Sequence, residues 1–254
     1  MTYTGNAPLE VLSLGAGVQS TTLLIMAMNG EIKKPDEIIF ADTGNEPKAV
    51  YEHLEYLKSI CPFKIGVVQW DNIVNWHLNS KYFILPVFTS GGGQLRRQCT
   101  DHFKLKPIRR YLVQKYGRRF KANMMIGFSA DEMNRRRISN KAWQTNIYPL
   151  IEKNMSREDC KNYLKEHGIQ VPGKSSCVVC PFHSPKYWRE FKAKYPDEYD
   201  EACKFDDKIR NLKFTKYNYY VCNIRRPLRD IDWGNPQLIM FEDMSQECTG
   251  ICGT

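Results

Sequence analysis

The chain has 254 residues, of which 42% are hydrophobic, enough for one α/β domain with an appendage or for two small domains. No early apolar segment of roughly 18 residues follows a basic start, so we expect a cytoplasmic protein without a signal peptide or membrane span. The net charge of +9 suits a polyanionic partner such as a nucleic acid. Nine cysteines cannot all pair within one chain, which favours metal binding or thiol chemistry over a disulfide framework.

The first predicted unit is a strand over Leu9 to Leu14, a turn of small residues, and a helix over Thr22 to Met28. Such a turn lets backbone N–H groups approach an anion at a helix N-terminus. The turn is neither a Gly-x-x-x-x-Gly-Lys-Ser/Thr loop nor a Gly-x-Gly-x-x-Gly loop. We predict that it binds a polyphosphate, although an ordinary glycine-containing turn stays an alternative. The candidate contacts are Ser13, Gly15, Ala16, Gly17, Gln19, Ser20 and Thr21.

A second strand is predicted over Glu37 to Ala41 and a second helix over Ala49 to Ile60, with Asp42, Thr43 and Gly44 between them. Ligands of open parallel sheets bind at the carboxyl ends of the strands. This turn should therefore lie beside the phosphate loop. The alternative is that Asp42 and Thr43 only cap the next helix.

Further strands are predicted over Lys64 to Trp70 and Asn123 to Ile126, with a helix over Phe103 to Tyr116 between them. Gly91 to Gly93 marks a loop. Alternating strands and helices with right-handed crossovers predict an α/β fold with a doubly wound parallel sheet.

The composition changes near Tyr148, where a predicted helix around 157–166 leads into an aromatic and charged segment, helical to about Leu212. We therefore predict two domains. Residues 1–147 would form the nucleotide-binding α/β domain. Residues 148–254 would form a smaller, mainly helical subdomain whose end is expected to be mobile.

Cys177 and Cys180 form a C-x-x-C pair, and Cys99 supplies a third thiolate. Three sulfur ligands can hold a [4Fe–4S] cluster that has one open iron. A zinc site or a redox pair are the alternatives. The cysteines predicted to be small buried hydrophobic residues are Cys61, Cys160, Cys203 and Cys222.

Three motifs resemble one superfamily. The loop from Ser13 resembles the Ser-Gly-Gly-x-Asp-Ser pyrophosphate loop of ATP pyrophosphatases, with Gln19 in place of Asp and Ala16 in place of one Gly. Asp42 to Gly44 resembles the Asp-Thr-Gly turn of that group. Gly127 to Glu132 with the arginines beyond it resembles a Gly-x-Arg-x-Asp/Glu-Glu-x-x-x-Arg segment beside the nucleotide, with Ser129 in place of the first Arg.

The segment Gln98 to Ile108 resembles the Cys-Cys-x-x-x-Lys-x-x-Pro-Leu segment of adenylylsulfate reductases, with Gln98 in place of the first cysteine. A three-cysteine cluster instead resembles those of tRNA thiolases and DNA phosphorothioation enzymes. The matches cover roughly residues 9 to 190. Together they are similar to the phosphoadenylylsulfate (PAPS) reductase-like family of the adenine nucleotide alpha hydrolase, or PP-loop ATP pyrophosphatase, superfamily, in its iron–sulfur sulfurtransferase-like branch.

This resemblance implies a Rossmann-like fold and further site residues. Nucleotide contacts would come from Gly127, Glu132, Arg135 and Arg136, and Mg²⁺ would be bound by Asp42 or Asp131. The tail Glu247-Cys248-Thr249-Gly250 is similar to a Glu-Cys-Gly that enters the site of such reductases. Cys248 and Cys252 would then act as a persulfide carrier or resolving thiol. Two incidental thiols, or a fourth cluster ligand, are the alternative.

The leading hypothesis is an ATP-dependent, pyrophosphate-releasing sulfurtransferase that acts on a nucleic acid, such as tRNA or DNA, or on a nucleotide. Its substrate would meet Arg96 and Arg97, and its sulfur would come from a donor such as a cysteine desulfurase. Two copies of the chain could form a homodimer. The first alternative is a reductase of phosphoadenylylsulfate or adenylylsulfate that uses Cys248. The second is a zinc-stapled nucleic-acid-binding protein without turnover.

Overall fold

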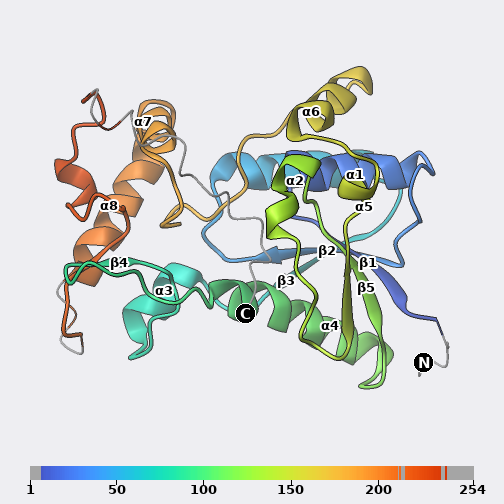
Figure 1. Ribbon diagram of the computed structural model, residues 1–254, viewed down its shortest axis with the longest axis horizontal. Coiled ribbons are helices and arrows are strands. Elements are labelled where there is room, and N and C mark those ends of the chain that lie inside the picture. Colours follow the sequence, from blue (N-terminus) through green and yellow to red (C-terminus); the bar gives the residue numbers. More distant parts are fainter. Residues whose placement is uncertain (1–6, 211, 213–214, 236–237, 239–254) are drawn as a thin grey trace. The chain divides into compact units, whose positions relative to one another are not determined.

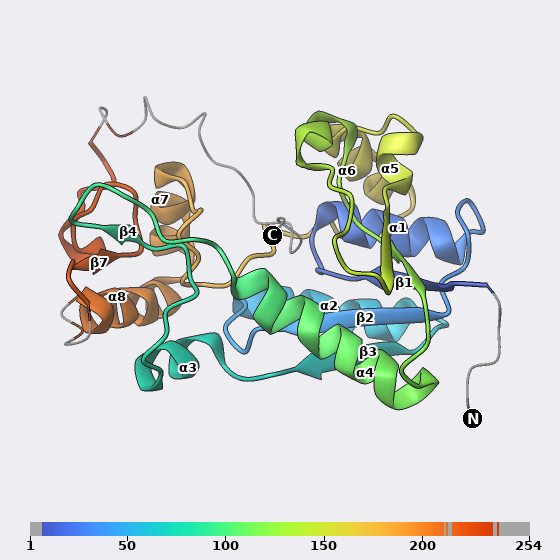
Figure 2. The ribbon, with the colours of Figure 1, turned by 60° about the horizontal axis from the view of Figure 1, so that its bottom comes forward.

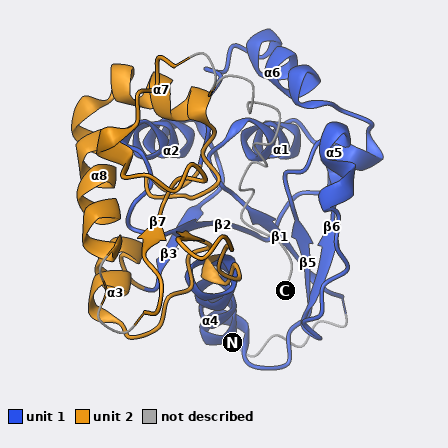
Figure 3. Ribbon diagram, turned by 60° about the vertical axis from the view of Figure 1, so that its left-hand side comes forward, with its two compact units in different colours: residues 1–70, 100–175, 249–254 blue, residues 71–99, 176–248 orange. Residues whose placement is uncertain are grey.

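The computed structural model describes residues 7–210, 212, 215–235 and 238 (Figure 1). The chain divides into two compact units, drawn in blue and orange in Figure 3. Unit 1 holds the described residues of 7–70 and 100–175, and unit 2 holds those of 71–99 and 176–238. Within the described ranges, no helix combines the length and the apolar character needed to cross a bilayer.

These units divide the chain at other points than the predicted boundary after residue 147. Residues 148–175 stay in unit 1 because Cys160 and Leu164 are buried in the same core cluster as the first helix. Residues 71–99 belong to unit 2, where a strand of this segment pairs with one near residue 220. Both departures depend on packing between segments far apart in the sequence.

Unit 1 contains a sheet of five parallel strands in the order β3-β2-β1-β5-β6. Its strands are β1 Leu9–Ser13, β2 Glu37–Asp42, β3 Ile65–Gln69, β5 Ala122–Met125 and β6 Gln144–Ile147. The predicted α/β fold with a parallel sheet is confirmed. The strand β6 was not predicted, because this edge strand reads Gln-Thr-Asn-Ile and has no apolar run.

Helices lie on both faces of this sheet, as Figures 2 and 3 show. One face is covered by α1 Val18–Met28, α2 Lys48–Ile60, α5 Pro149–Glu152 and α6 Arg157–Glu166, and the other by α4 Lys106–Tyr116. Alternate strand residues enter the two core layers: Leu12 and Phe40 pack on the α1 side, Val11 and Ile39 on the α4 side. The sheet is therefore doubly wound. A turn of π-helix, Asp101–Leu105, precedes α4, so the predicted helix from Phe103 consists of two parts.

Unit 2 is mainly helical, with one two-stranded antiparallel sheet. Its elements are α3 Ile73–Asn79, β4 Phe88–Thr89, α7 Pro185–Lys194, α8 Pro196–Arg210, β7 Tyr219–Tyr220 and a 3₁₀ turn at Leu228–Asp230. Trp188 of α7 is fully buried against Tyr199 and Trp233. The carboxylate of Asp206 in α8 accepts the backbone N–H groups of Val221 and Leu228. This aromatic core and buried carboxylate connect the helices to the segment after β7.

A buried histidine organises the segment that leads to Cys99. The side chain of His77 in α3 is fully buried, with Nδ1 2.6 Å from the carbonyl oxygen of Ile73. Its Nε2 accepts the backbone N–H groups of Ile84 and Leu85, both at 3.2 Å. An Nε2 atom that accepts two N–H bonds must be unprotonated, so the folded protein holds a neutral His77.

We expect the free energy of unfolding to fall as the pH drops from about 6.5 to about 4, because burial lowers the pKa of His77 from 6.5 to about 4. In that window the unfolded chain binds a proton that the folded chain does not bind, which stabilises the unfolded state by up to about 3 kcal/mol. Urea unfolding at several pH values would measure this loss. His77→Gln should reduce the pH dependence by about half, because buried His53, whose pKa is also lowered to about 4, contributes over the same pH window. The control His167→Gln, at an exposed position, should leave the pH dependence unchanged. An unchanged slope in His77→Gln would contradict the assignment.

Candidate nucleotide-binding site

The predicted phosphate loop lies where the strand order of the unit 1 sheet reverses. The loop follows β1, and the neighbouring strand on one side is β2, while on the other side it is β5, which comes much later in the chain. Loops after two such strands diverge to opposite faces and leave a crevice that is the usual ligand position in open α/β sheets. The loops after β1 and β5 therefore form the candidate site.

The backbone of the first loop is arranged around one oxygen atom. The N–H groups of Gly15 and Gly17 both donate to Ser20 Oγ at 3.2 Å, and this hydroxyl lies 3.2 Å from the carbonyl oxygen of Gly17. Ala16 has φ of +53°, a left-handed conformation that favours glycine. Ala16 thus adopts a glycine-like conformation at a position where the similar pyrophosphate loop has Gly. Successive N–H groups around a left-handed residue form an anion-binding concavity.

Two glycines are required by close approach of other segments. A Cβ atom on Gly127, which follows β5, would lie 2.8 Å from the backbone nitrogen of Ser20. A Cβ atom on Gly17 would lie 2.4 Å from Ser175 Oγ. The loop is consequently held between the β5 loop and Ser175, a residue that the sequence analysis did not single out.

Gln19 connects the loop to two other segments of unit 1. Its side chain is only 6% exposed, and its Nε2 donates to Glu132 Oε2 at 2.9 Å and to Ser129 Oγ at 3.4 Å. Its Oε1 accepts Arg157 Nη1 at 3.1 Å. Gln19 therefore positions its neighbours, and its contact with a ligand stays a prediction. Arg157 was not predicted, because it opens a helix 138 residues away and belongs to no recognised motif.

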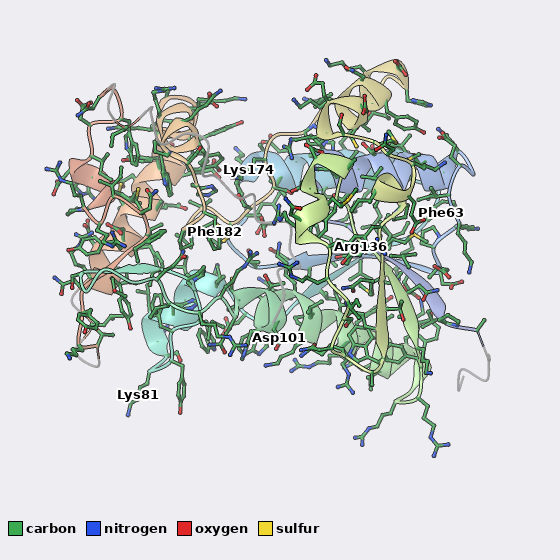
Figure 4. The ribbon with its side chains drawn as sticks, in the orientation of Figure 1. Phe63, Lys81, Asp101, Arg136, Lys174 and Phe182 are labelled. Carbon is green, nitrogen blue, oxygen red and sulfur yellow. The ribbon has the colours of Figure 1, made fainter. Side chains whose placement is uncertain are left out.

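The residues after β5 lie close to this network. Arg135 forms an ion pair with Glu132, and its guanidinium lies 5.1 Å from the ring centroid of Phe128. Arg136 is exposed, and its guanidinium lies 5.8 Å from the ring centroid of Tyr148 (Figure 4). The structure therefore brings Gly127, Glu132 and Arg135 together with the first loop.

The turn after β2 is stabilised by its own side chains. Asp42 Oδ1 accepts the N–H of Gly44 at 2.7 Å and the hydroxyl of Tyr51 at 2.8 Å, and burial raises the pKa of Tyr51. Thr43 donates to Glu46 Oε1 at 2.9 Å. Glu46 is buried, and Lys104 of the π-helical turn lies 3.8 Å from the same oxygen. The predicted acidic turn therefore exists, with Asp42 fixed at the end of its strand.

Two other predicted contacts have structural partners. Asp131 is exposed, and its Oδ1 accepts the backbone N–H of Arg157 at 3.0 Å, which caps α6. Thr21 is fully buried, with Oγ1 3.1 Å from His53 Nε2 of α2. Burial lowers the pKa of His53 to about 4, so this ring is neutral near pH 7. The Thr21 hydroxyl thus joins α1 to α2.

The three predicted cluster cysteines, Cys99, Cys177 and Cys180, all belong to unit 2. The C-x-x-C forms a turn in which the N–H of Cys180 donates to the carbonyl oxygen of Cys177 at 3.0 Å. The guanidinium of Arg97 lies 5.2 Å from the ring centroid of Phe182, so the segment before Cys99 lies against the segment after Cys180.

Among the described residues, no group of three or more His, Cys, Asp or Glu side chains is arranged to hold a metal ion. Cluster binding stays a prediction. Cys248 and Cys252, the predicted tail thiols, lie outside the described residues.

The remaining cysteines largely match their predicted structural role. Cys160, Cys203 and Cys222 are buried, and Cys61 is half-buried. Burial raises the pKa of Cys160 to about 11 and that of Cys222 to about 12. Such thiols stay protonated at neutral pH and are poor nucleophiles.

Of three comparisons with known proteins, one, the family model, agrees with the motifs. A search of curated proteins finds no significant match. A crystal structure of phosphoadenylyl-sulfate reductase from Candida auris, in a phosphate complex, is similar with 14% identity and a TM-score of 0.46, over 66% of this chain and 76% of that chain. The sequence model of the phosphoadenosine phosphosulfate reductase domain matches residues 10–173. This chain therefore belongs to the phosphoadenosine phosphosulfate reductase domain family.

Proposed function

We propose that this chain is an enzyme that binds an adenine nucleotide by its phosphates on the loop from Ser13 to Ser20. The main observation is the convergence of the Gly15 and Gly17 N–H groups on a single oxygen, at the point where the strand order reverses. That oxygen is the Ser20 hydroxyl. A phosphate oxygen that took its place would accept both N–H groups, and the N-terminus of α1 would add partial positive charge. The family of the chain supports this proposal.

The reaction that we propose first is ATP-dependent sulfur transfer to a nucleic acid or nucleotide. An oxygen of the substrate attacks the α-phosphorus, the bond to the β-phosphate oxygen breaks, and pyrophosphate leaves. The loop N–H groups would stabilise the developing charge. Proteins bind Mg²⁺ through one or two carboxylates and the substrate phosphates, a role for Asp42 or Asp131. A sulfide-level sulfur atom that the sulfur donor supplies then attacks the activated centre, and AMP leaves with the substrate oxygen that had attacked the α-phosphorus.

The second candidate is a sulfonucleotide reductase, with which the family match is equally compatible. The same loop would hold the phosphates of phosphoadenylylsulfate or adenylylsulfate. The Cys248 thiolate would attack the sulfur atom, and the nucleotide phosphate would leave. A second thiol would then release sulfite by forming a disulfide with Cys248. The neutral Gln19, in place of the Asp of ATP pyrophosphatases, agrees with this reaction.

The two reactions release different products. Wild-type protein, prepared without oxygen, would be assayed for pyrophosphate with ATP and tRNA or DNA, and for sulfite with the two sulfonucleotides. We expect ATP-dependent thiolation that Cys177→Ala abolishes with ATP binding intact. The matched control Cys203→Ala changes another buried unit 2 thiol and should stay active. Sulfite release that requires Cys248 would replace the first proposal with the second, and the absence of both products would overturn both.

Metal content tests the predicted cluster separately. About four irons and four sulfides per chain, lost in Cys99→Ala, are expected for a [4Fe–4S] protein. Zinc instead would support the nucleic-acid-binding alternative. Absence of iron after attempted reconstitution would contradict the cluster.

A further inference from the structure

The excess positive charge of this protein is confined to two segments of unit 2. Residues 72–99 contain three Lys or Arg residues and no Asp or Glu, and residues 208–229 contain seven and none. The whole chain has 37 basic and 28 acidic residues, so the rest of it has 27 basic and 28 acidic residues. The charge of +9 thus belongs almost entirely to these segments.

The fold brings the two segments together. β4 pairs with β7 in antiparallel register, with Phe88 opposite Tyr220 and Thr89 opposite Tyr219, and the two strands lie side by side in Figure 2. Beyond the strands, the N–H of Ser90 donates to the carbonyl oxygen of Asn218 at 3.0 Å. We call the surface of residues 88–96, 215–220 and 225–226 the β4–β7 face.

An exposed aromatic ring is held in place on this face. Tyr217 is 43% exposed, and a Cβ atom on Gly91 would lie 2.7 Å from its ring, so the ring packs directly on the Gly91 backbone. The ammonium group of Lys216 lies 5.5 Å from the ring centroid. A large aromatic side chain with this exposure is suited to stack on an unpaired base.

The side chain of Arg225 is anchored next to the glycine on which the ring packs. Arg225 donates from Nη2 to the carbonyl oxygen of Gly92 at 2.7 Å, and its φ of +56° fixes the backbone there in a left-handed conformation. In the part of the chain that the structure describes, Arg210 and Arg229 pair with acidic residues of α8. Among the described residues, no ion pair of the kind that Arg210 and Arg229 form involves five other exposed basic residues: Lys81, Arg96, Lys216, Arg225 and Arg226. Lys81 projects away from the ribbon in Figure 4.

From this arrangement we propose that the β4–β7 face binds an unpaired segment of a nucleic acid. Lys216, Arg225 and Arg226 would contact phosphates, and a base would stack on Tyr217. Stacked bases together with neutralised phosphates are how sequence-tolerant single-strand binding works. The inference rests on the proposed function, because it assigns the surface that receives the nucleic-acid substrate.

Charge removal tests the phosphate contacts. Binding of a 20-nucleotide single-stranded RNA and of the same DNA sequence would be measured by fluorescence anisotropy over a range of salt concentrations. Lys216→Ala/Arg226→Ala should weaken binding at least tenfold and reduce the slope of log K against log salt by about 1.4. The control Arg118→Ala/Arg119→Ala removes the same charge from an exposed pair in unit 1 and should change neither. Equal losses in both variants would overturn the proposal.

Removal of the ring tests the stacking contact. Tyr217→Ala should weaken binding about tenfold without changing the salt slope, whereas Tyr217→Phe keeps the ring and should bind like the wild type. Equal affinity for duplex DNA or heparin, or no effect of Tyr217→Ala, would overturn the proposal. Circular dichroism and thermal unfolding would verify that the variants are folded.

The same proteins separate this inference from the proposed function. Adenine nucleotide affinity should be unchanged in all four variants, since none alters the loop from Ser13. Nucleotide binding by a wild-type protein that binds neither oligonucleotide would overturn the β4–β7 face alone. Oligonucleotide binding without nucleotide binding would overturn the proposed function. It would still support the β4–β7 face as a nucleic-acid-binding surface.

Discussion

The Gly127→Ala protein is expected to lose nucleotide affinity by a hundredfold or more. The added Cβ atom would lie 2.8 Å from the backbone nitrogen of Ser20 and 3.1 Å from the carbonyl carbon of Gln19. A backbone atom cannot rotate away as a side chain can, so the phosphate loop and the β5 loop must separate. Separation moves the Gly15 and Gly17 N–H groups out of their common orientation, on which phosphate binding depends.

The matched control for this variant is Gly173→Ala in the same unit. Its Cβ atom would meet no atom within 4 Å. Titration calorimetry with ATP and with phosphoadenylylsulfate would measure both proteins, and circular dichroism would establish that they are folded. A Gly127→Ala protein that binds either nucleotide within threefold of the wild type contradicts the assignment of the site.

The Gln19→Glu protein is expected to bind nucleotide about tenfold to a hundredfold more weakly at neutral pH. This substitution keeps the shape of the side chain but replaces the donor Nε2 with a carboxylate oxygen, 2.9 Å from Glu132 Oε2. Two carboxylates at this distance repel each other, and one of them must take up a proton. The resulting rearrangement would also shift Arg157, which is bound to the other oxygen of residue 19.

A pH series distinguishes charge repulsion between residues 19 and 132 from a packing defect at residue 19 alone. Because a shared proton restores the hydrogen bond between residues 19 and 132, affinity of Gln19→Glu should recover as the pH falls toward 5. Adding Glu132→Gln returns a donor to the pair and should restore most of the affinity at neutral pH. The control Gln114→Glu, on the exposed surface of α4, should bind like the wild type. If adding Glu132→Gln lowers the nucleotide affinity further, repulsion between residues 19 and 132 is not the cause of the loss.

Much of unit 1 could be predicted because its signals are local. Short, mostly apolar segments mark β1, β2 and β3, and a 3.6-residue period marks α2. The strand β6 and the helix α3 were not predicted, because neither Gln144–Ile147 nor Ile73–Asn79 has a strong hydrophobic period of its own. Their secondary structure is decided by the sheet edge and by burial of His77.

The parallel α/β fold and the family resemblance were predictable from the sequence, because each depends on residues that are close together along the chain. The partners of Gln19, the contact of Ser175 with the first loop and the pairing of the two basic segments through β4 and β7 became visible only in the folded chain. These contacts connect residues more than a hundred positions apart. Local propensity carries no information on such pairings, which result from how helices and strands pack around a shared core.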